Sequence, residues 1–249
     1  MGHAHHTRRR AFRPTCCAVR ILSVVAMTGG LARAGEPFEV DARKLDGPLV
    51  SPWRTIRLDP AYSGQWLVAG DLDGDGRAEL VVARNDNQRI TAALAVRLDG
   101  SVLWRWGEPD AGSPILTYDV SLQLYDMDGD GRAEVYLSTR DFLLVLDGRT
   151  GKELRRLPLP KGLAVSDCIA FANLRGRSRA QDILVKTRYD RIWAYTDDWK
   201  PLWEWRPRDG AKTCHFPTLL DIDDDGRDEV MAGYTMLDHD GRELWTLGH

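Results

Sequence analysis

Short apolar segments separated by polar turns recur along the chain from Gln65 onward. Their β-branched and aromatic residues are typical of strands, and the segments come in groups of four. The third segment of most groups ends in Asp-Gly, which suits a tight hairpin because glycine accepts a positive φ. Each group therefore predicts one antiparallel sheet of four strands. The segments are 65–70, 79–84, 93–100 and 101–106; 121–126, 134–139, 142–148 and 152–157; 168–173, 182–187, 192–198 and 200–205; 216–221, 229–234, 235–241 and 242–247.

A short acidic motif follows the first strand of each group, which makes the groups copies of one repeat. In the first copy the sequence is GDLDGDGRAE at residues 70–79, and we count Asp71 as position 1 of the motif. Position 1 of the four copies is occupied by Asp71, Asp126, Asn173 and Asp221. The spacings of 55, 47 and 48 residues match a four-stranded propeller blade of about 40–50 residues. We therefore predict an all-β fold, a β-propeller with about four blades in residues 65–249, preceded by a lead-in segment at 35–64.

Three copies of the motif carry carboxylates at positions 1, 3, 5 and 9, with a glycine at position 6 where the chain must double back. Together with the carbonyl at position 7 they offer the six or seven oxygen ligands that Ca²⁺ takes, whereas Mg²⁺ prefers a rigid octahedron with retained waters. We predict three calcium sites, mainly structural, with a solvated acidic turn as the alternative. The ligands are Asp71, Asp73, Asp75, the Arg77 carbonyl and Glu79; Asp126, Asp128, Asp130, the Arg132 carbonyl and Glu134; and Asp221, Asp223, Asp225, the Arg227 carbonyl and Glu229.

The third copy departs from this pattern. Asn173, Arg175 and Arg177 align with the three aspartates, and Gln181 aligns with the closing glutamate. Guanidinium groups cannot bind a cation, but they can bridge acidic neighbours such as Asp182 and hold the same turn without metal. We therefore expect three metal-binding copies and one copy closed by a salt bridge.

The first 34 residues differ from the rest of the chain. They hold six arginines and no acidic residue, followed by an apolar run at 21–27 and the small-residue sequence ARA at 32–34. This order is typical of a secretory signal peptide cleaved before Gly35. The RRAF sequence at 9–12 also resembles a twin-arginine signal, so either export route is open. The expected location is periplasmic or extracellular.

Removal of this segment makes the chain strongly acidic. Without its six arginines, 28 basic residues face 37 acidic ones, and the formal charge falls from −3 to −9. Such a balance disfavours nucleic acid and anionic membranes as partners and suits bound cations. No apolar run reaches the ~20 residues of a membrane-spanning helix. The two remaining cysteines, Cys168 and Cys214, are compatible with one disulfide or with two buried thiols.

The repeats resemble known proteins at two levels. The D-x-D-x-D-G-x-x-E loops look like the calcium loops of FG-GAP/VCBS-type propellers. More narrowly, the stretch NLRG…QDILVKTRYD at 173–190 is similar to the propeller of the rhamnogalacturonan lyases (polysaccharide lyase family 11). The resemblance extends over roughly 65–249.

The resemblance implies a secreted, calcium-rich, eight-bladed propeller that cleaves pectic rhamnogalacturonan by β-elimination. That chemistry needs a cation near the uronate carboxylate and a base that removes the C5 proton. The candidate groups are Lys186, Arg188, Tyr189 and His215, each with a purely structural role as the alternative. The chain is thus expected to act on or bind acidic pectin-type polysaccharide. The competing hypothesis is a non-catalytic FG-GAP/VCBS-type structural or adhesion module.

About four blades are half of such a ring, and we interpret them as an incomplete arc. A closing strand from the lead-in segment is the alternative, and WRTIRL at 53–58 is its candidate. The fourth repeat, however, already holds a fourth strand of its own at 242–247. An arc would leave a blade face uncovered, so self-association is expected.

Overall fold

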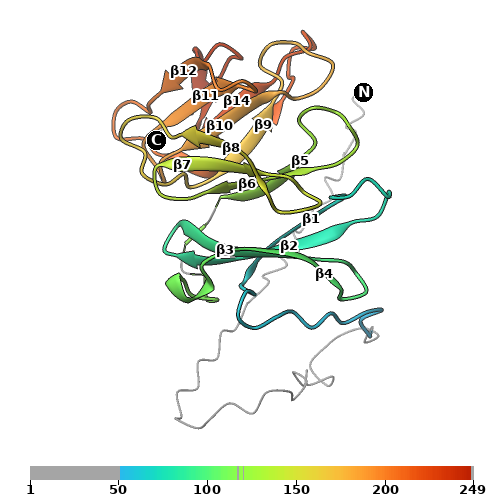
Figure 1. Cartoon of the computed structure of the whole chain (residues 1–249). Coiled ribbons are helices and arrows are strands. Elements are labelled where there is room, and N and C mark those ends of the chain that lie inside the picture. Colours follow the sequence, from blue (N-terminus) through green and yellow to red (C-terminus); the bar gives the residue numbers. More distant parts are fainter. Residues whose placement is uncertain (1–50, 117, 120, 248–249) are drawn as a thin grey trace, which may run out of the picture. The chain divides into compact units, whose positions relative to one another are not determined.

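The computed structural model describes residues 51–116, 118–119 and 121–247, and within them the chain forms sixteen strands in four sheets (Figure 1). The predicted signal segment at 1–34 and most of the lead-in lie outside the described residues. Blade 1 contains β1 (Trp66–Gly70), β2 (Glu79–Asp86), β3 (Arg89–Val96) and β4 (Val102–Gly107). Blade 2 contains β5 (Leu122–Tyr125), β6 (Glu134–Ser138), β7 (Phe142–Leu146) and β8 (Glu153–Pro158). Blade 3 contains β9 (Ile169–Ala172), β10 (Asp182–Lys186), β11 (Ile192–Thr196) and β12 (Pro201–Trp205). Blade 4 contains β13 (Thr213–Leu220), β14 (Glu229–Gly233), β15 (Thr235–Leu237) and β16 (Glu243–Thr246).

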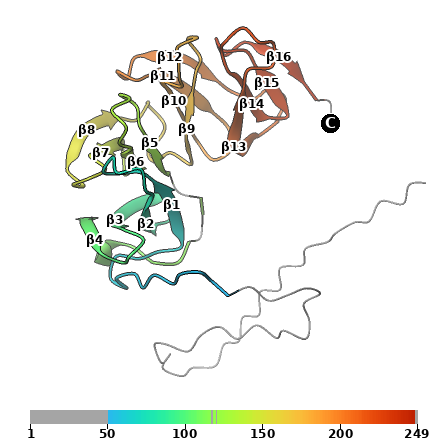
Figure 2. The ribbon, with the colours of Figure 1, turned by 90° about the vertical axis from the view of Figure 1, so that its right-hand side faces the viewer.

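Every sheet is an antiparallel meander of consecutive strands, which confirms the predicted all-β propeller repeat. The first strands contact one another in the order β1, β5, β9 and β13, as the inner strands of successive propeller blades do (Figure 2). One boundary differs from expectation, because β13 begins at Thr213 rather than Phe216. The extra residues belong to a register shift between Thr213 and Thr218. Pro217 has no amide to donate, and such a residue is tolerated where pairing is interrupted on an edge strand.

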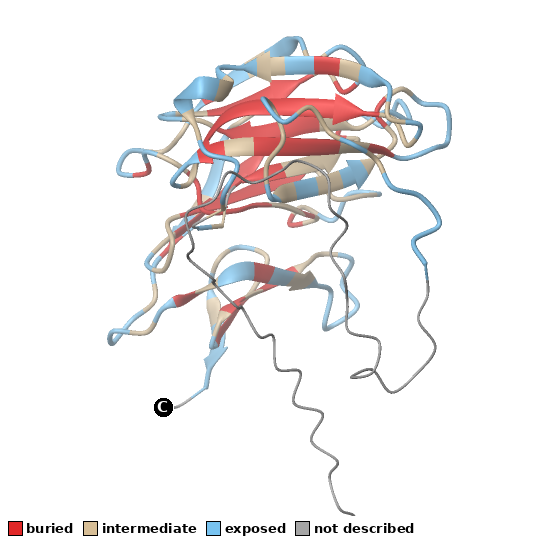
Figure 3. Cartoon of the chain, turned by 90° about the horizontal axis from the view of Figure 1, so that it is seen from below, coloured by how far each residue is buried: buried red, intermediate tan, exposed pale blue. Residues whose placement is uncertain are grey.

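The cores lie between successive blades and are built by their middle strands. Figure 3 shows the buried residues concentrated in these strands, and β3, β10 and β11 are buried along almost their full length. Alternation along each strand sends one set of side chains to the preceding blade and the other set to the following blade. Val81 and Ala83 of blade 1, for example, pack with Val135 and Leu137 of blade 2.

Tryptophans of two fourth strands donate hydrogen bonds to the following blade. Trp104 Nε1 donates a hydrogen bond to the Gly148 carbonyl at 2.6 Å, and Trp203 Nε1 donates to the His239 carbonyl at 2.9 Å. A Cβ at Gly241 would approach the Trp203 ring to within 2.7 Å, so this turn leaves room only for glycine. Trp104 and Trp203 thus pack between blades, whereas Trp245 in blade 4 is 41% exposed.

The lead-in residues cover blade 1 and do not pair with blade 4. Within the described part of the chain, 53–58 form no strand. Ile56 and Leu58 instead pack on Val82 and Val96, on the side of blade 1 that faces away from blade 2. The candidate closing strand is therefore wrong, because its apolar residues bury a face of the first sheet.

Two further expectations concern the cysteines and the membrane. Cys168 is buried and Cys214 half-buried, and the structure has both as free thiols. In the described residues, no helix has the length and apolar character needed to span a membrane.

Candidate functional site: acidic loops and a polar cluster at opposite blade edges

The blades present two chemically different edges. The acidic motifs join the first and second strands, and the turns between third and fourth strands lie at the same edge, which we call the loop edge. The turns between second and third strands lie at the opposite edge, together with the residues that enter each first strand; we call this the hairpin edge. A meander imposes this separation, because successive antiparallel strands turn at alternate ends.

At the loop edge, the first acidic motif folds back on itself through its own aspartate. Asp71 accepts hydrogen bonds from the Gly74 and Gly76 amides at 2.7 and 2.8 Å. Both glycines have φ near +80°, a conformation that costs other residues free energy. Ligand atoms of Asp71, Asp73 and Glu79 all lie within 4.8 Å of one another. The motif thus gathers oxygens of three of its five predicted ligands around one point.

The second and fourth motifs repeat this arrangement. Asp126 accepts from the Gly131 amide at 3.0 Å and Asp221 from the Gly226 amide at 2.9 Å. In each motif the aspartates at positions 1, 3 and 5 bring ligand atoms within 4.8 Å of one another. In the second motif, the Arg132 guanidinium binds Asp130, with Nε at 3.0 Å from the carboxylate. A metal ion in this loop would therefore compete with Arg132 for the Asp130 carboxylate.

Whether the first loop fits Ca²⁺ can be judged from its own polar atoms. Asp73 Oδ1 is buried and has no hydrogen-bond partner in the protein, although Oδ2 of the same side chain binds Arg97 at 2.8 Å. A buried carboxylate oxygen without a partner is costly. A hard cation held by Asp71, Asp73 and the position-7 carbonyl would satisfy it. The donor set therefore fits calcium.

The glutamate at position 9 has a different role from the aspartates. Glu79, Glu134 and Glu229 accept the backbone amide of motif position 2, at Leu72, Met127 and Ile222, with distances of 2.9, 3.0 and 2.8 Å. Burial raises the pKa of Glu134 to about 7 and also raises the pKa values of Glu79 and Glu229. Each glutamate thus closes its loop. Glu79 also brings a carboxylate oxygen within 4.8 Å of ligand atoms of Asp71 and Asp73, whereas Glu229 does so with Asp238 and His239.

The third motif carries a guanidinium where the other three motifs carry an aspartate. Arg175 Nε lies 2.6 Å from Asp182, and its Nη2 lies 2.6 Å from Asp197 of the neighbouring turn. This confirms the predicted salt bridge to Asp182. The alignment of Gln181 with the closing glutamate is wrong, however, because Asp182 accepts the Leu174 amide at 2.9 Å and is fully buried. The side chain of aspartate is shorter than that of glutamate, and Asp182 lies one residue later in its motif than the closing glutamate does in the other copies.

The four candidate catalytic residues come together at the hairpin edge. Lys186 is fully buried, and its Nζ lies 2.8 Å from Asp167 and 2.8 Å from the Arg188 carbonyl. Arg188 also reaches Asp167, at 3.4 Å, and lies 5.2 Å from the Tyr189 ring centroid. A buried ammonium with two such partners holds the turn that carries Arg188 and Tyr189.

His215 completes this group, which we call the Lys186 cluster. Tyr189 OH and His215 Nε2 are 3.1 Å apart, and His215 Nδ1 contacts the Asp119 carboxylate. A carboxylate on one imidazole nitrogen fixes the ring and leaves the other nitrogen for the phenol. The order Asp119, His215, Tyr189 is a chain of hydrogen bonds that can carry a proton. The side chain of His215, the middle member, is 53% exposed, so this chain of hydrogen bonds lies at the surface.

Sequence reasoning missed the acidic partners of this cluster. Asp119 precedes β5, Asp167 precedes β9, and Gln88, which also binds Asp167, lies in the turn between β2 and β3. They lie up to 96 residues from the side chains that they contact. The available signal was positional: each residue stands just before a first strand or in a β2–β3 type turn, and the repeat brings these places to one edge.

The comparisons with known proteins agree with the fold. The model of the FG-GAP-like repeat family matches residues 71–137. Two curated relatives are rhamnogalacturonan lyases of Bacillus subtilis (strain 168). The exolyase YesX is 24% identical over 271 residues, covering 82% of this chain and 44% of the relative. The endolyase YesW is 26% identical over 252 residues, covering 75% and 40%. The chain therefore spans less than half the length of these relatives.

Solved structures give the same fold. A Bacillus licheniformis rhamnogalacturonan lyase of family PL11 superposes with a TM-score of 0.59 at 22% identity, covering 78% of this chain and 45% of that one. The V. cholerae biofilm matrix protein Bap1 superposes with a TM-score of 0.52 at 21% identity, covering 79% and 33%. The relatives of the chain are thus rhamnogalacturonan lyases, which confirms the resemblance found in the sequence.

Proposed function

We propose that the chain is an exported calcium-binding propeller that acts on acidic pectin-type polysaccharide by β-elimination. The observation that carries this proposal is the Lys186 cluster, in which a guanidinium and a hydrogen-bonded phenol and imidazole meet at one surface. The rhamnogalacturonan lyases among its relatives favour a uronate-containing substrate. Export is supported by the acid-free first 34 residues with their small-residue end.

The roles of the side chains follow from their exposure and contacts. Arg188, whose side chain is 30% exposed, is placed to bind a uronate carboxylate, and an arginine does so with two parallel hydrogen bonds. Neutralising that carboxylate makes the C5 proton more acidic. Tyr189, coupled to His215 and Asp119, removes this proton at its hydroxyl oxygen and passes its own proton to His215 Nε2. As the C5 proton leaves, the C4–O bond breaks and a C4=C5 double bond forms. The leaving oxygen takes up one proton from solvent, and His215 later releases the proton that it received. Lys186 is buried and is a positioning residue that fixes Arg188 and Tyr189.

Calcium in the three acidic loops is proposed to be structural. These loops lie at the loop edge, whereas the Lys186 cluster lies at the hairpin edge, so a loop cation does not touch the substrate at the cluster. Bound calcium would instead fix the connections between first and second strands.

A direct assay tests the proposal. The full chain is incubated with rhamnogalacturonan and calcium, and the ultraviolet absorbance of an unsaturated uronide is followed. We expect absorbance from the wild type, a loss of roughly 10²-fold or more in His215→Ala, and retained activity in the control His239→Ala, because His239 lies at the loop edge. Absence of any unsaturated product would refute the catalytic part of the proposal.

The alternative of a non-catalytic binding or adhesion module has one observation in its favour. The match to the FG-GAP-like repeat family concerns the acidic loops of blades 1 and 2 and does not include the Lys186 cluster. For such a module, polysaccharide would bind without cleavage, and His215→Ala would leave that binding unchanged.

A further inference from the structure

The loop edge of each blade contains a notch between its acidic motif and the turn before its fourth strand. In blades 2, 3 and 4 a fourth-strand side chain of the preceding blade enters this notch and donates a hydrogen bond to a turn carbonyl. Trp104 reaches Gly148, Arg155 reaches Asp197 at 2.6 Å, and Trp203 reaches His239. The notch is therefore a place where the fold already accepts flat aromatic or guanidinium groups.

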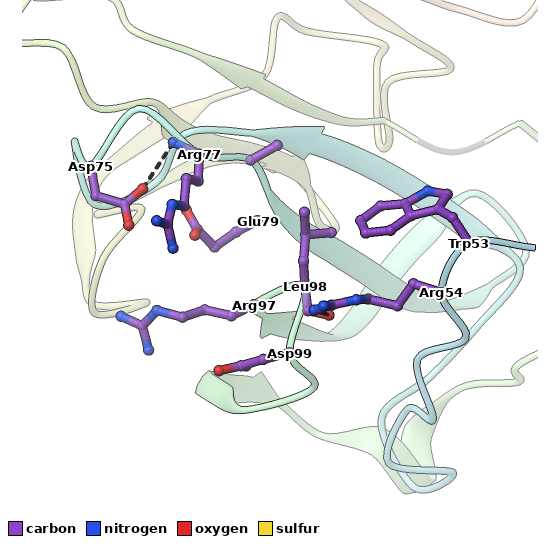
Figure 4. A pocket seen from close by; sticks show the side chains of 9 residues that line it. Trp53, Arg54, Asp75, Arg77, Glu79, Arg97, Leu98 and Asp99 are labelled. Atoms are coloured by element: carbon purple, nitrogen blue, oxygen red, sulfur yellow. Dashed lines mark hydrogen bonds between the residues drawn. The ribbon is translucent and has the colours of Figure 1, made fainter.

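The notch of blade 1 is filled by the lead-in residues. In place of a fourth-strand side chain from a preceding blade, Arg54 enters this notch, and its Nη1 donates a hydrogen bond to the Leu98 carbonyl at 2.8 Å. The adjacent Trp53 indole is 80% exposed. A cavity of about 260 Å³ remains, which we call the first notch, lined by Trp53, Arg54, Asp75, Arg77, Ala78, Glu79, Arg97, Leu98 and Asp99 (Figure 4).

The shape and lining of the first notch suit one sugar residue. Its volume lies below the roughly 300–1,000 Å³ of sites for drug-sized ligands. An indole offers a broad apolar platform, and the Arg54 guanidinium lies 5.2 Å from its centroid. Figure 4 shows the Arg77 side chain between Asp75 and Arg97, on the motif side of the cavity. An apolar platform beside guanidinium groups is chemistry that recognises an acidic sugar.

The charge of the first notch depends on the adjacent acidic loop. Its lining carries three guanidinium groups and three carboxylates, and is neutral overall. Asp75 and Glu79 belong to the first acidic motif. A bound Ca²⁺ would add two positive charges next to the cavity and draw Asp75 and Glu79 away from the arginines, so that Asp99 would be the one lining carboxylate not facing the metal.

We propose that the first notch is a subsite for a single uronate residue of an acidic polysaccharide. Trp53 provides the stacking platform, Arg77 binds the uronate carboxylate, and calcium in the first loop is required. This subsite is separate from the Lys186 cluster, because the two lie at opposite edges of the blades. It would hold the polymer at a distance from the residues that act on it.

Calorimetric titration of the full chain with digalacturonate tests the subsite. The background is Arg188→Gln, which removes carboxylate binding at the Lys186 cluster, so the result does not depend on the proposed catalytic function. With calcium, we expect one binding event that Arg77→Gln weakens roughly 10- to 100-fold, the effect of losing a charged hydrogen bond. Trp53→Ala should weaken it by roughly 10-fold or more.

Matched controls separate this site from the general acidity of the loops. Arg227→Gln changes the same motif position in blade 4, where Trp203 enters the notch, and should leave binding unchanged. Galactobiose, which lacks the carboxylates, should bind at least roughly 10-fold more weakly. Equal affinities with and without Arg77, or binding that persists in EDTA, would overturn the proposal.

Discussion

The third motif and the three acidic motifs solve one structural problem in two ways. All four must close a tight connection between the first and second strands of a blade. The acidic motifs gather aspartates that repel one another without a cation, whereas the third carries its own cation in Arg175, 2.6 Å from Asp182. The shared element is the acid that accepts the amide of motif position 2; it is buried in three motifs and half-buried at Glu134. An arginine neutralises the acid in the third motif, and the proposed calcium would have the same effect in the other three.

Removal of calcium should have the largest effect on stability, and this effect should come from the three acidic motifs and not from the third motif. We expect EDTA to lower the free energy of unfolding by roughly 3 kcal/mol for each site that had free calcium at about 100 times its dissociation constant. Calorimetric titration of the chelated protein should give three calcium ions per chain. A stoichiometry of zero or four, or an unchanged melting temperature in EDTA, would contradict the division into three metal-binding loops and one salt-bridged loop.

Loss of the acid in the third motif should be the next largest effect. Asp182→Ala leaves the Leu174 amide and the Arg175 guanidinium without their buried partner, and we expect a destabilisation of about 3 kcal/mol. Because no metal is involved, urea unfolding should show the same loss with calcium and with EDTA. Gln181→Ala is the matched control and should cost about 1 kcal/mol or less. Equal effects of the two substitutions would restore Gln181 as the closing residue.

The stability of the calcium-free protein should depend on pH through the glutamates of the acidic motifs. Burial raises the pKa of Glu134 to about 7 from a usual 4.5. The folded state therefore retains a proton that the unfolded chain releases, so the stability of the calcium-free protein falls between about pH 4.5 and pH 7. Glu134→Gln should remove this decline and stabilise the calcium-free protein at pH 8 by roughly 1–2 kcal/mol, because partial exposure reduces the effect.

Calcium should reverse the effect of Glu134→Gln on the free energy of unfolding. A cation favours the charged carboxylate, so Glu134→Gln should destabilise the calcium-loaded protein. Thermal unfolding of wild type and variant at pH 8, with calcium and with EDTA, gives the four values needed. If the variant were less stable in both conditions, burial would not be the dominant effect at Glu134.

The strands and the loops were predictable because both depend on local patterns. Alternating apolar segments and repeated Asp-Gly turns indicated all four sheets, and the spacing of Asp71, Asp73 and Glu79 indicated a cluster that the structure forms. The closing acid of the third motif was assigned one residue too early. A sequence alignment counts positions, whereas the fold selects the carboxylate that reaches the Leu174 amide.

Long-range partners were not predictable from one sequence. The pairing of His215 with Asp119 joins residues 96 positions apart, and nothing local to either residue indicates the other. The position of the lead-in was not predictable either, because Ile56 and Leu58 can be buried by any apolar face and the sequence does not say which. Local chemistry thus indicated the blade and its acidic loop, and tertiary packing decided what covers each face.

The smallest expected effect concerns the arginine inside an acidic motif. Arg132 binds Asp130 in the second motif, so a calcium ion there must displace an intramolecular cation. Arg132→Ala should leave stability in EDTA almost unchanged, because both side chains are exposed. It should raise the calcium affinity of the second loop a few-fold. Titration in an Asp71→Asn, Asp221→Asn background isolates this loop. An unchanged affinity would show that the arginine and the metal use different oxygens of Asp130, and the analogy between guanidinium and calcium would then hold only for the third motif.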